Sequence, residues 1–223
     1  MQSPRALAGQ LRAVLLAGSA TQLRLLVPMV TGPDDVRAVR ELLQSVAADL
    51  PGVRLPQIGA MIEVPAAATL AERLAGEVDF FSIGTNDLTQ FQLGIDRAVP
   101  GRAPAHHPAV LRLIDATVRA AHAGGVVVDV CGEAASDRIG LPLLLGLDVD
   151  ELSVGAARVG ALRAWTRALD QAEARKLALR ALDAASAAEV ERLVRPLAER
   201  LLESDDAGAY GFEGRNGVSA VGA

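Results

Sequence analysis

Three short polar clusters follow apolar runs of the sequence, at positions where chemistry could take place. They are Glu63-Val64-Pro65, Gly84-Thr85-Asn86-Asp87 and Cys131-Gly132-Glu133. A polar cluster directly after an apolar run is typical of the point where a buried strand ends. Because the carboxyl ends of parallel barrel strands form one reactive face, we expect the three clusters to converge.

Two carboxylates in these clusters, Glu63 and Asp87, predict a site for Mg²⁺. This ion takes one or two carboxylates in proteins and fills its other positions with water and substrate phosphate oxygens. The alternative is helix capping, because acidic residues also favour the first turn of a helix. For Asp87 alone the two interpretations are equal, whereas the pair favours the metal site.

The elements that must position these clusters form a repeated strand-and-helix pattern. Five apolar runs are predicted as strands: residues 23–29, 58–64, 78–83, 126–131 and 150–154. Helices are predicted over residues 5–17, 33–50, 65–75, 108–123, 136–145 and 156–168, with one or two more within 177–202 and a loop over 90–107. Such continuous apolar strands, each followed by a helix, predict a parallel sheet buried on both faces.

The predicted fold class is α/β, an incomplete TIM-type (β/α) barrel with C-terminal helices. The chain has no glycine-rich dinucleotide fingerprint, which favours a barrel over a Rossmann fold. An intact barrel needs eight strands, so five correspond to about the last five βα units. We expect a helical segment over 1–22, the partial barrel over 23–170, further helices over 171–203 and a disordered tail over 204–223.

The composition excludes several classes of protein. The 223 residues are 51% hydrophobic and 22% charged, which is typical of a globular chain, and only 3% are aromatic, so the core must be aliphatic. The net charge of −5 gives no electrostatic reason to expect nucleic-acid binding. No apolar run approaches the roughly 20 residues that cross a bilayer, and residues 1–10 lack a signal-peptide pattern. We therefore expect a cytoplasmic protein that does not contact membranes.

The clusters and their flanking residues resemble motifs of the phosphoenolpyruvate-utilising enzymes. Residues 58–68 (IGAMIEVPAAA) are similar to the fifth-strand motif of that family. Residues 78–90 (VDFFSIGTNDLTQ) resemble its long signature run, and residues 130–133 (VCGE) resemble its Cys-Gly-Glu motif.

Three further segments resemble one branch of this family, Enzyme I of the sugar phosphotransferase system. They are Ile95-Asp96-Arg97, residues 107–111 (HPAVL) and residues 150–154 (DELSV). The other branch, pyruvate phosphate dikinase and phosphoenolpyruvate synthase, shares the main motifs and stays an alternative. The resemblance extends over about residues 8–168.

The resemblance implies a role for each candidate site residue. Glu63 and Asp87 would bind Mg²⁺, and Asn86 would hold the phosphate with its neighbouring backbone. Arg97 would pair with the phosphate or carboxylate of phosphoenolpyruvate, and Cys131 would protonate the enolate carbon as pyruvate leaves. These roles suit phosphoryl transfer, in which catalysis is mostly positioning and neutralisation of charge.

Cys131 is the sole cysteine of the chain. A single cysteine at the end of an apolar strand is more often a small buried hydrophobic residue than a catalyst. The adjacent Gly132 and Glu133, together with the other clusters, favour the proton-donor role. Glu133 itself is either a supporting residue of the site or a helix cap.

Enzyme I transfers the phosphoryl group to a histidine of an N-terminal domain, through which it meets a phosphocarrier protein. His106, His107 and His122 match no phosphohistidine motif, and we expect them at the surface. The predicted partners are phosphoenolpyruvate or pyruvate, and either a second copy of the chain or a missing half of the barrel that covers the apolar edge at 23–29. The alternatives are an inactive binding or dimerisation module and a metal-dependent lyase or aldolase.

Overall fold

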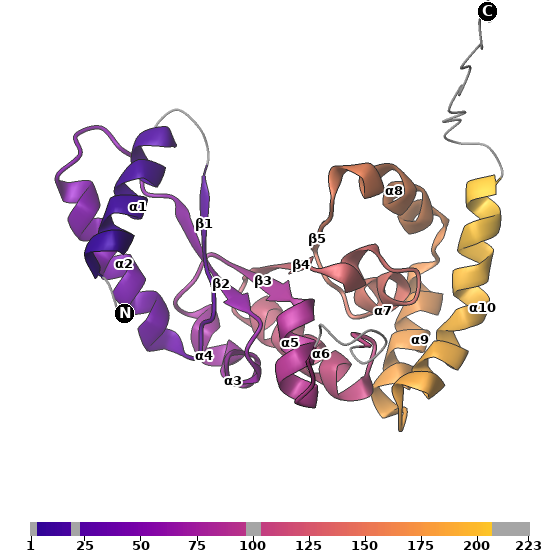
Figure 1. Ribbon diagram of the computed structural model, residues 1–223. Helices are drawn as coiled ribbons and strands as arrows, with labels where there is room; N and C mark the ends of the chain where they lie inside the picture. Colours follow the sequence, from indigo (N-terminus) through magenta and orange to yellow (C-terminus); the bar gives the residue numbers. More distant parts are fainter. Residues whose placement is uncertain (1–3, 19–22, 97–103, 207–223) are drawn as a thin grey trace, which may run out of the picture.

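The computed structural model describes residues 4–18, 23–96 and 104–206, and these contain one parallel five-stranded sheet (Figure 1). The strands lie in the order in which they occur in the chain: β1 (Arg24–Val27), β2 (Gln57–Ile62), β3 (Phe80–Gly84), β4 (Val127–Cys131) and β5 (Glu151–Ser153). Every neighbouring pair is parallel. The predicted α/β class and all five predicted strands are therefore confirmed.

A helix or a pair of helices follows each strand. The described helices are α1 (Pro4–Ala17), α2 (Pro33–Ala48), α3 (Pro65–Thr69), α4 (Ala71–Ala75), α5 (Thr85–Leu93), α6 (Pro108–Ala123), α7 (Gly140–Gly146), α8 (Val159–Ala168), α9 (Gln171–Asp183) and α10 (Ala187–Asp206). Short 3₁₀ turns, η1 (Glu133–Ser136) and η2 (Ala156–Arg158), precede α7 and α8. None of the described helices is long and apolar enough to cross a membrane.

The two faces of the sheet differ in burial. The outward residues of β2, β3 and β4 are almost inaccessible, at 0–2% exposure: Ile58, Ala60, Ile62, Phe81, Ile83, Val128 and Val130. Helix α6 packs against β3 and β4 on this side. On the other, inward face, Phe80 and Ser82 of β3 are buried. Residues of the other strands on this face are partly open: Gln57, Met61, Val127, Asp129, Cys131, Glu151 and Ser153. The prediction of burial on both faces is thus wrong for much of the inward face, because five strands do not close around it.

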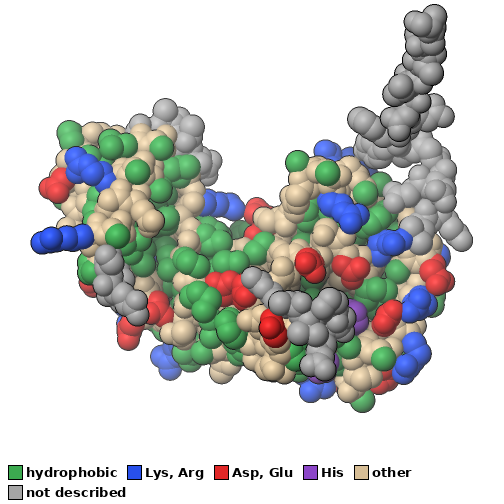
Figure 2. Space-filling view, in the orientation of Figure 1, with side chains coloured by type: hydrophobic (Ala, Val, Ile, Leu, Met, Phe, Trp, Pro, Cys, Tyr) green, Lys and Arg blue, Asp and Glu red, His purple; other side chains and the backbone are tan. Residues whose placement is uncertain are grey.

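The sheet is strongly curved. A guanidinium nitrogen of Arg24 on β1 lies 3.1 Å from a carboxylate oxygen of Glu151 on β5, which joins the first strand to the last. In a flat sheet these strands would be roughly 19 Å apart, farther than two side chains reach. Figure 2 shows the resulting hollow between the end that carries α1 and α2 and the end that carries α8.

Helix α5 replaces the beginning of the predicted loop over 90–107. It starts directly after β3, where Thr89 Oγ1 donates a 2.6 Å hydrogen bond to the backbone oxygen of Thr85. It ends at Gly94, whose φ of +60° is the left-handed conformation that favours glycine, and Ile95 N–H closes the turn on Gln90 O at 3.1 Å. The predicted loop was wrong over residues 90–93, because the polar residues of the signature run show no apolar helical periodicity in the sequence.

Two of the three histidines are not simple surface residues. His107 precedes α6 and its Nδ1 accepts a 3.1 Å hydrogen bond from the backbone N–H of Ala109, so it caps the helix. His106 is also partly buried, whereas His122 is exposed and contacts Asp150. The expectation of surface histidines is confirmed for His122, whereas His106 and His107 are only partly exposed.

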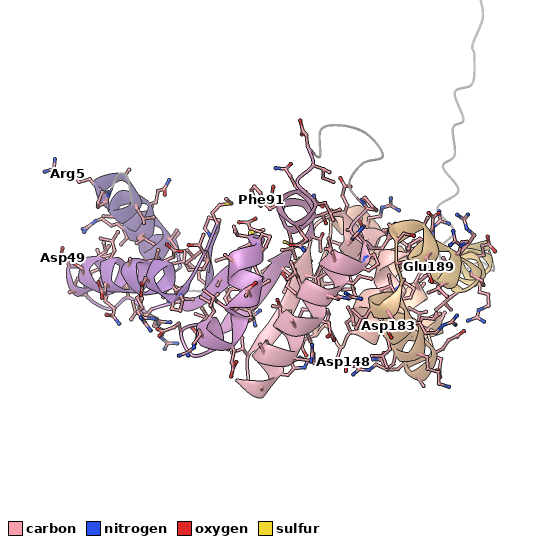
Figure 3. All side chains as sticks on the ribbon, turned by 90° about the horizontal axis from the view of Figure 1, so that it is seen from below. Arg5, Asp49, Phe91, Asp148, Asp183 and Glu189 are labelled. Carbon is pink, nitrogen blue, oxygen red and sulfur yellow. The ribbon has the colours of Figure 1, made fainter. Side chains whose placement is uncertain are left out.

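The C-terminal helices extend the molecule at the end opposite α1. Figure 3 shows Asp183 and Glu189, at the turn between α9 and α10, far from Arg5 on α1. Helix α9 packs tightly on α7: the backbones are so close that a Cβ atom on Gly146 would lie 2.3 Å from the backbone oxygen of Ala174. Residues 207–223, most of the predicted tail, lie outside the described residues.

Candidate functional site

The sheet register brings the three polar clusters to neighbouring strand ends. Ile62 of β2 pairs with Ile83 of β3, and Gly84 of β3 pairs with Cys131 of β4. Glu63 is therefore the residue after one strand and Cys131 the last residue of another, with the start of α5 between them. Asp87 lies in the first turn of α5.

Glu63 is held in a fixed position. Its side chain is 4% exposed, and its Oε1 accepts a 2.7 Å hydrogen bond from the backbone N–H of Met29. Met29 has a φ of +54°, which is uncommon for a residue with a side chain and turns its N–H toward the carboxylate. Glu63 Oε2 accepts no hydrogen bond among the described residues, so it is available to a cation or a ligand.

Gly84 leaves the space that the Glu63 carboxylate occupies. A Cβ atom on Gly84 would lie 3.0 Å from Glu63 Cβ and 3.2 Å from its Oε2, and 2.8 Å from Met61 Cε. Any larger residue would displace these groups. The glycine of the second cluster thus positions the acid of the first.

Hydrogen bonds join the second and third clusters directly. Thr85 Oγ1 donates to the backbone oxygen of Cys131 at 2.9 Å, and the backbone N–H of Glu133 donates to Asn86 Oδ1 at 3.1 Å. Gly132 between them has a φ of +100°, and a Cβ atom there would lie 2.4 Å from Thr85 Oγ1. The Cys-Gly-Glu sequence therefore requires its glycine for both backbone conformation and space.

The bond from Glu133 fixes the orientation of the Asn86 side chain. Because Oδ1 is used as the acceptor, the amide NH₂ is the group that stays available, and it carries two donors. These donors suit an anionic oxygen such as that of a phosphate. Glu133 contributes its backbone here, and its exposed carboxylate makes no hydrogen bond among the described residues.

Cys131 lies on the open inward face, beside Ser82. Its Sγ is 3.7 Å from Ser82 Oγ. Burial raises the pKa of the Cys131 thiol, the hydrogen bond with Ser82 opposes this, and the nearby carboxylates of Asp129 and Glu63 raise it further. The group is therefore a protonated thiol at neutral pH, as a proton donor must be.

We call the edge formed by the carboxyl ends of β2, β3 and β4 the rim. The oxygen atoms that its side chains offer are chemically suited to a hard cation. Glu63 and Asp87 offer carboxylate oxygens, and Glu63 Oε2 accepts no described hydrogen bond. In the described part of the chain no three His, Cys, Asp or Glu side chains form a group that could hold a metal ion. Arg97, predicted to bind substrate, lies outside the described residues.

Three residues at the site escaped the sequence-based prediction. Met29 presents its N–H through an unusual backbone conformation, which has no signature in sequence. Ser82 and Asp129 lie on the inward face, where Ser82 Oγ donates to Asp129 Oδ2 at 2.7 Å. An acid inside the apolar run 126–131 was a usable signal, because aspartate is disfavoured in strands.

Comparison with known proteins agrees with the motifs. Residues 1–171 match the family described as PEP-utilising enzyme, PEP-binding domain. Over 187 residues, 82% of this chain, the sequence is 46% identical to a multiphosphoryl transfer protein of Rhodobacter capsulatus. Over 195 residues, 83% of the chain, it is 44% identical to a phosphoenolpyruvate-protein phosphotransferase of Haloferax volcanii.

The chain spans only part of these relatives, 22% of the first and 34% of the second. Among solved structures, a citrate lyase from Burkholderia xenovorans LB400 has a TM-score of 0.58 over 89% of this chain and 69% of its own. At 17% identity this likeness concerns the fold alone, and it supports the assignment to an incomplete barrel.

Proposed function

Because this chain belongs to the PEP-utilising enzymes, through the PEP-binding domain of that family, we propose that it binds phosphoenolpyruvate and Mg²⁺ for an Enzyme I-type phosphoryl transfer. The accepting histidine would come from a part of the protein outside this sequence. The observation that supports the proposal most is the shared rim of Glu63, the Gly84–Asp87 turn and Cys131.

In the proposed site, Glu63 and Asp87 hold the cation, which supplies positive charge to the phosphate oxygens. Met29 N–H fixes one oxygen of Glu63 and leaves the other for this purpose. Asn86, oriented by the Glu133 N–H, donates its amide hydrogens to the phosphate. Arg97 is proposed to grip the phosphate or carboxylate through two parallel hydrogen bonds.

Cys131 is proposed to donate its S–H proton to the methylene carbon of the enolate once the phosphoryl group has left. A new C–H bond forms, the S–H bond breaks, and the electron pair stays on sulfur as a thiolate. The raised pKa of the thiol suits this role, because the proton stays on sulfur until a strong carbon base is present.

Calorimetric titration of the chain with phosphoenolpyruvate and Mg²⁺ tests the proposal. We expect Glu63→Gln and Asp87→Asn to weaken binding at least about tenfold, since each charged contact contributes roughly 1.5–3 kcal/mol. Glu133→Gln is the matched control, because it removes an exposed acid at the same rim. Equal binding by all four proteins would contradict the metal site, and no binding by the unmodified chain would favour the inactive module.

A second measurement separates binding from transfer. The chain has three histidines, and His107 is occupied as a helix cap. We expect radiolabelled phosphoenolpyruvate to leave no acid-labile phosphate on the isolated chain. Such a phosphoprotein would contradict the proposal that the acceptor lies elsewhere.

We also propose a cytoplasmic location and a second copy or further barrel strands as the partner of the β1 edge.

A further inference from the structure

Asp129 is an acid in an unusual place. It lies in the middle of β4, on the inward face, two residues before Cys131. Its Oδ2 accepts the hydrogen bond from Ser82, and its Oδ1 is buried with no hydrogen-bond partner among the described residues. A buried carboxylate oxygen without a partner is destabilising, so stability alone does not account for an acid at this position.

The register places Asp129 and Ser82 side by side. Ser82 of β3 pairs directly with Asp129 of β4, and two residues along, Gly84 pairs with Cys131. Because side chains alternate along a strand, Ser82, Asp129 and Cys131 share the inward face. Ser82 is 2% exposed, which holds its hydroxyl between the carboxylate at 2.7 Å and the sulfur at 3.7 Å.

A serine hydroxyl has one hydrogen to donate. The short contact with a carboxylate, which is acceptor-only when ionised, claims that hydrogen. Ser82 Oγ has only this hydrogen to offer to the sulfur of Cys131, which lies 3.7 Å away, so the carboxylate competes with the sulfur for it. A thiolate at Cys131 would largely lack this donor and would lie near the Asp129 carboxylate, which repels it.

We propose that Asp129 is a positioning residue that holds the Ser82 hydroxyl hydrogen away from the sulfur and so keeps Cys131 protonated on the inward face. This inference deepens the proposed function, because it gives the state of the sulfur before proton transfer. Other groups act on the same sulfur. Glu63 at the end of β2 raises the thiol pKa as Asp129 does, and β5 presents uncharged Ser153 beside Cys131.

The pKa of the thiol tests this inference without any substrate. As Cys131 is the sole cysteine, the rate of alkylation by iodoacetamide against pH reports on it alone. We expect Asp129→Asn to lower the midpoint and to raise the alkylation rate at pH 7 by about three- to tenfold, since one pKa unit is a tenfold change in thiolate. Ser82→Ala removes the hydroxyl that can donate to the sulfur and should raise the midpoint, because the hydrogen bond with Ser82 lowers the thiol pKa.

Glu151→Gln is the matched control. Glu151 is the register partner of Asp129 on β5 and loses the same charge, but it contacts Arg24 and not Ser82. We expect it to leave the midpoint unchanged. Circular dichroism of each variant shows whether it is folded, and the serine variant serves if the Asp129 variant is not.

An unchanged or raised midpoint in folded Asp129→Asn would overturn the inference. A lowered midpoint in Ser82→Ala would also overturn it, because Ser82 would then not be the donor for which the carboxylate and the sulfur compete. Neither result bears on phosphoenolpyruvate binding, and loss of that binding would not alter the thiol titration. Failure of this inference and failure of the proposed function are therefore distinguishable.

Discussion

The carboxylate of Glu63 lies against the backbone of Gly84, with Oε2 only 3.2 Å from the position that a Cβ atom on Gly84 would take. Met29 N–H holds the other oxygen from the opposite side at 2.7 Å. The acid is therefore clamped between the ends of β1 and β3. Its geometry depends on two backbone positions as much as on its own side chain.

Gly84→Ala should displace this carboxylate and weaken Mg²⁺-dependent binding of phosphoenolpyruvate about tenfold or more, which corresponds to roughly 1.4 kcal/mol. The added methyl group would also press on Met61 Cε at 2.8 Å. Gly160→Ala on α8 is the control, because a Cβ atom there meets nothing within 4 Å. Calorimetry gives both affinities, and equal values would show that Glu63 does not hold the cation.

Asn86→Asp should weaken phosphoenolpyruvate binding at least about tenfold, because it replaces two amide donors by a negative oxygen that faces an anion. The fold should be kept, since an aspartate oxygen still accepts the Glu133 N–H. Binding is measured by calorimetry, and the unfolding temperature serves as the control. Unchanged affinity together with an unchanged unfolding temperature would remove Asn86 from the phosphate site.

Gly132→Ala should destabilise the chain and not only the site. The residue combines a φ of +100° with a Cβ position 2.4 Å from Thr85 Oγ1, so the substitution adds backbone strain and a steric clash. We expect a loss of about 1–3 kcal/mol in the free energy of unfolding, measured with urea. Gly155→Ala, at the open end of β5, is the control with nothing within 4 Å. Equal stability of the two variants would contradict the steric argument.

Acidification should destabilise the protein through His106. Burial lowers the pKa of this imidazole, while Asp137 and Glu191 oppose the shift. The unfolded chain then binds the proton more readily, so stability is present above the ordinary histidine pKa of 6.5 and is lost as the pH falls through the folded value. In His106→Gln, the unfolding temperature should decrease less steeply as the pH is lowered from about 6.5 to about 5. An identical slope in the variant would assign the acid sensitivity to other groups.

Alkaline conditions should act through Cys131 in the opposite sense. The pKa of its thiol is raised, chiefly by burial, so the folded state favours the protonated form. Its contribution to stability is full below the unfolded thiol pKa and is lost as the pH rises through the folded value. Urea unfolding of the protein and of Cys131→Ser, from neutral pH to above the unfolded thiol pKa, measures the effect. A slope that survives in the serine variant would exclude the thiol as its cause.

The sequence predicted the strands well because each contains short runs of apolar residues between turn signals; Val128 and Val130, on either side of Asp129, are buried to 0% exposure. It also predicted that the three polar clusters follow the ends of neighbouring strands, which the register of β2, β3 and β4 confirms. It missed α5, because the residue types of Thr85-Asn86-Asp87 are typical of a turn. In the structure these residues begin a helix, in which Thr89 Oγ1 donates a hydrogen bond to the backbone oxygen of Thr85. The backbone of Met29 and the Ser82–Asp129 contact were also missed, because both depend on which residues the register brings side by side.

The ion pair between Arg24 and Glu151 has a consequence for assembly. Both side chains are close to half exposed, so the pair contributes little to stability, about 0–1 kcal/mol. Its importance is geometric: it shows how near β1 and β5, the two edge strands of the described sheet, approach each other. Strands that complete the sheet, from this polypeptide or from another, therefore have to fit between these two edges, and added strands of the wrong number would leave backbone donors unsatisfied at one edge.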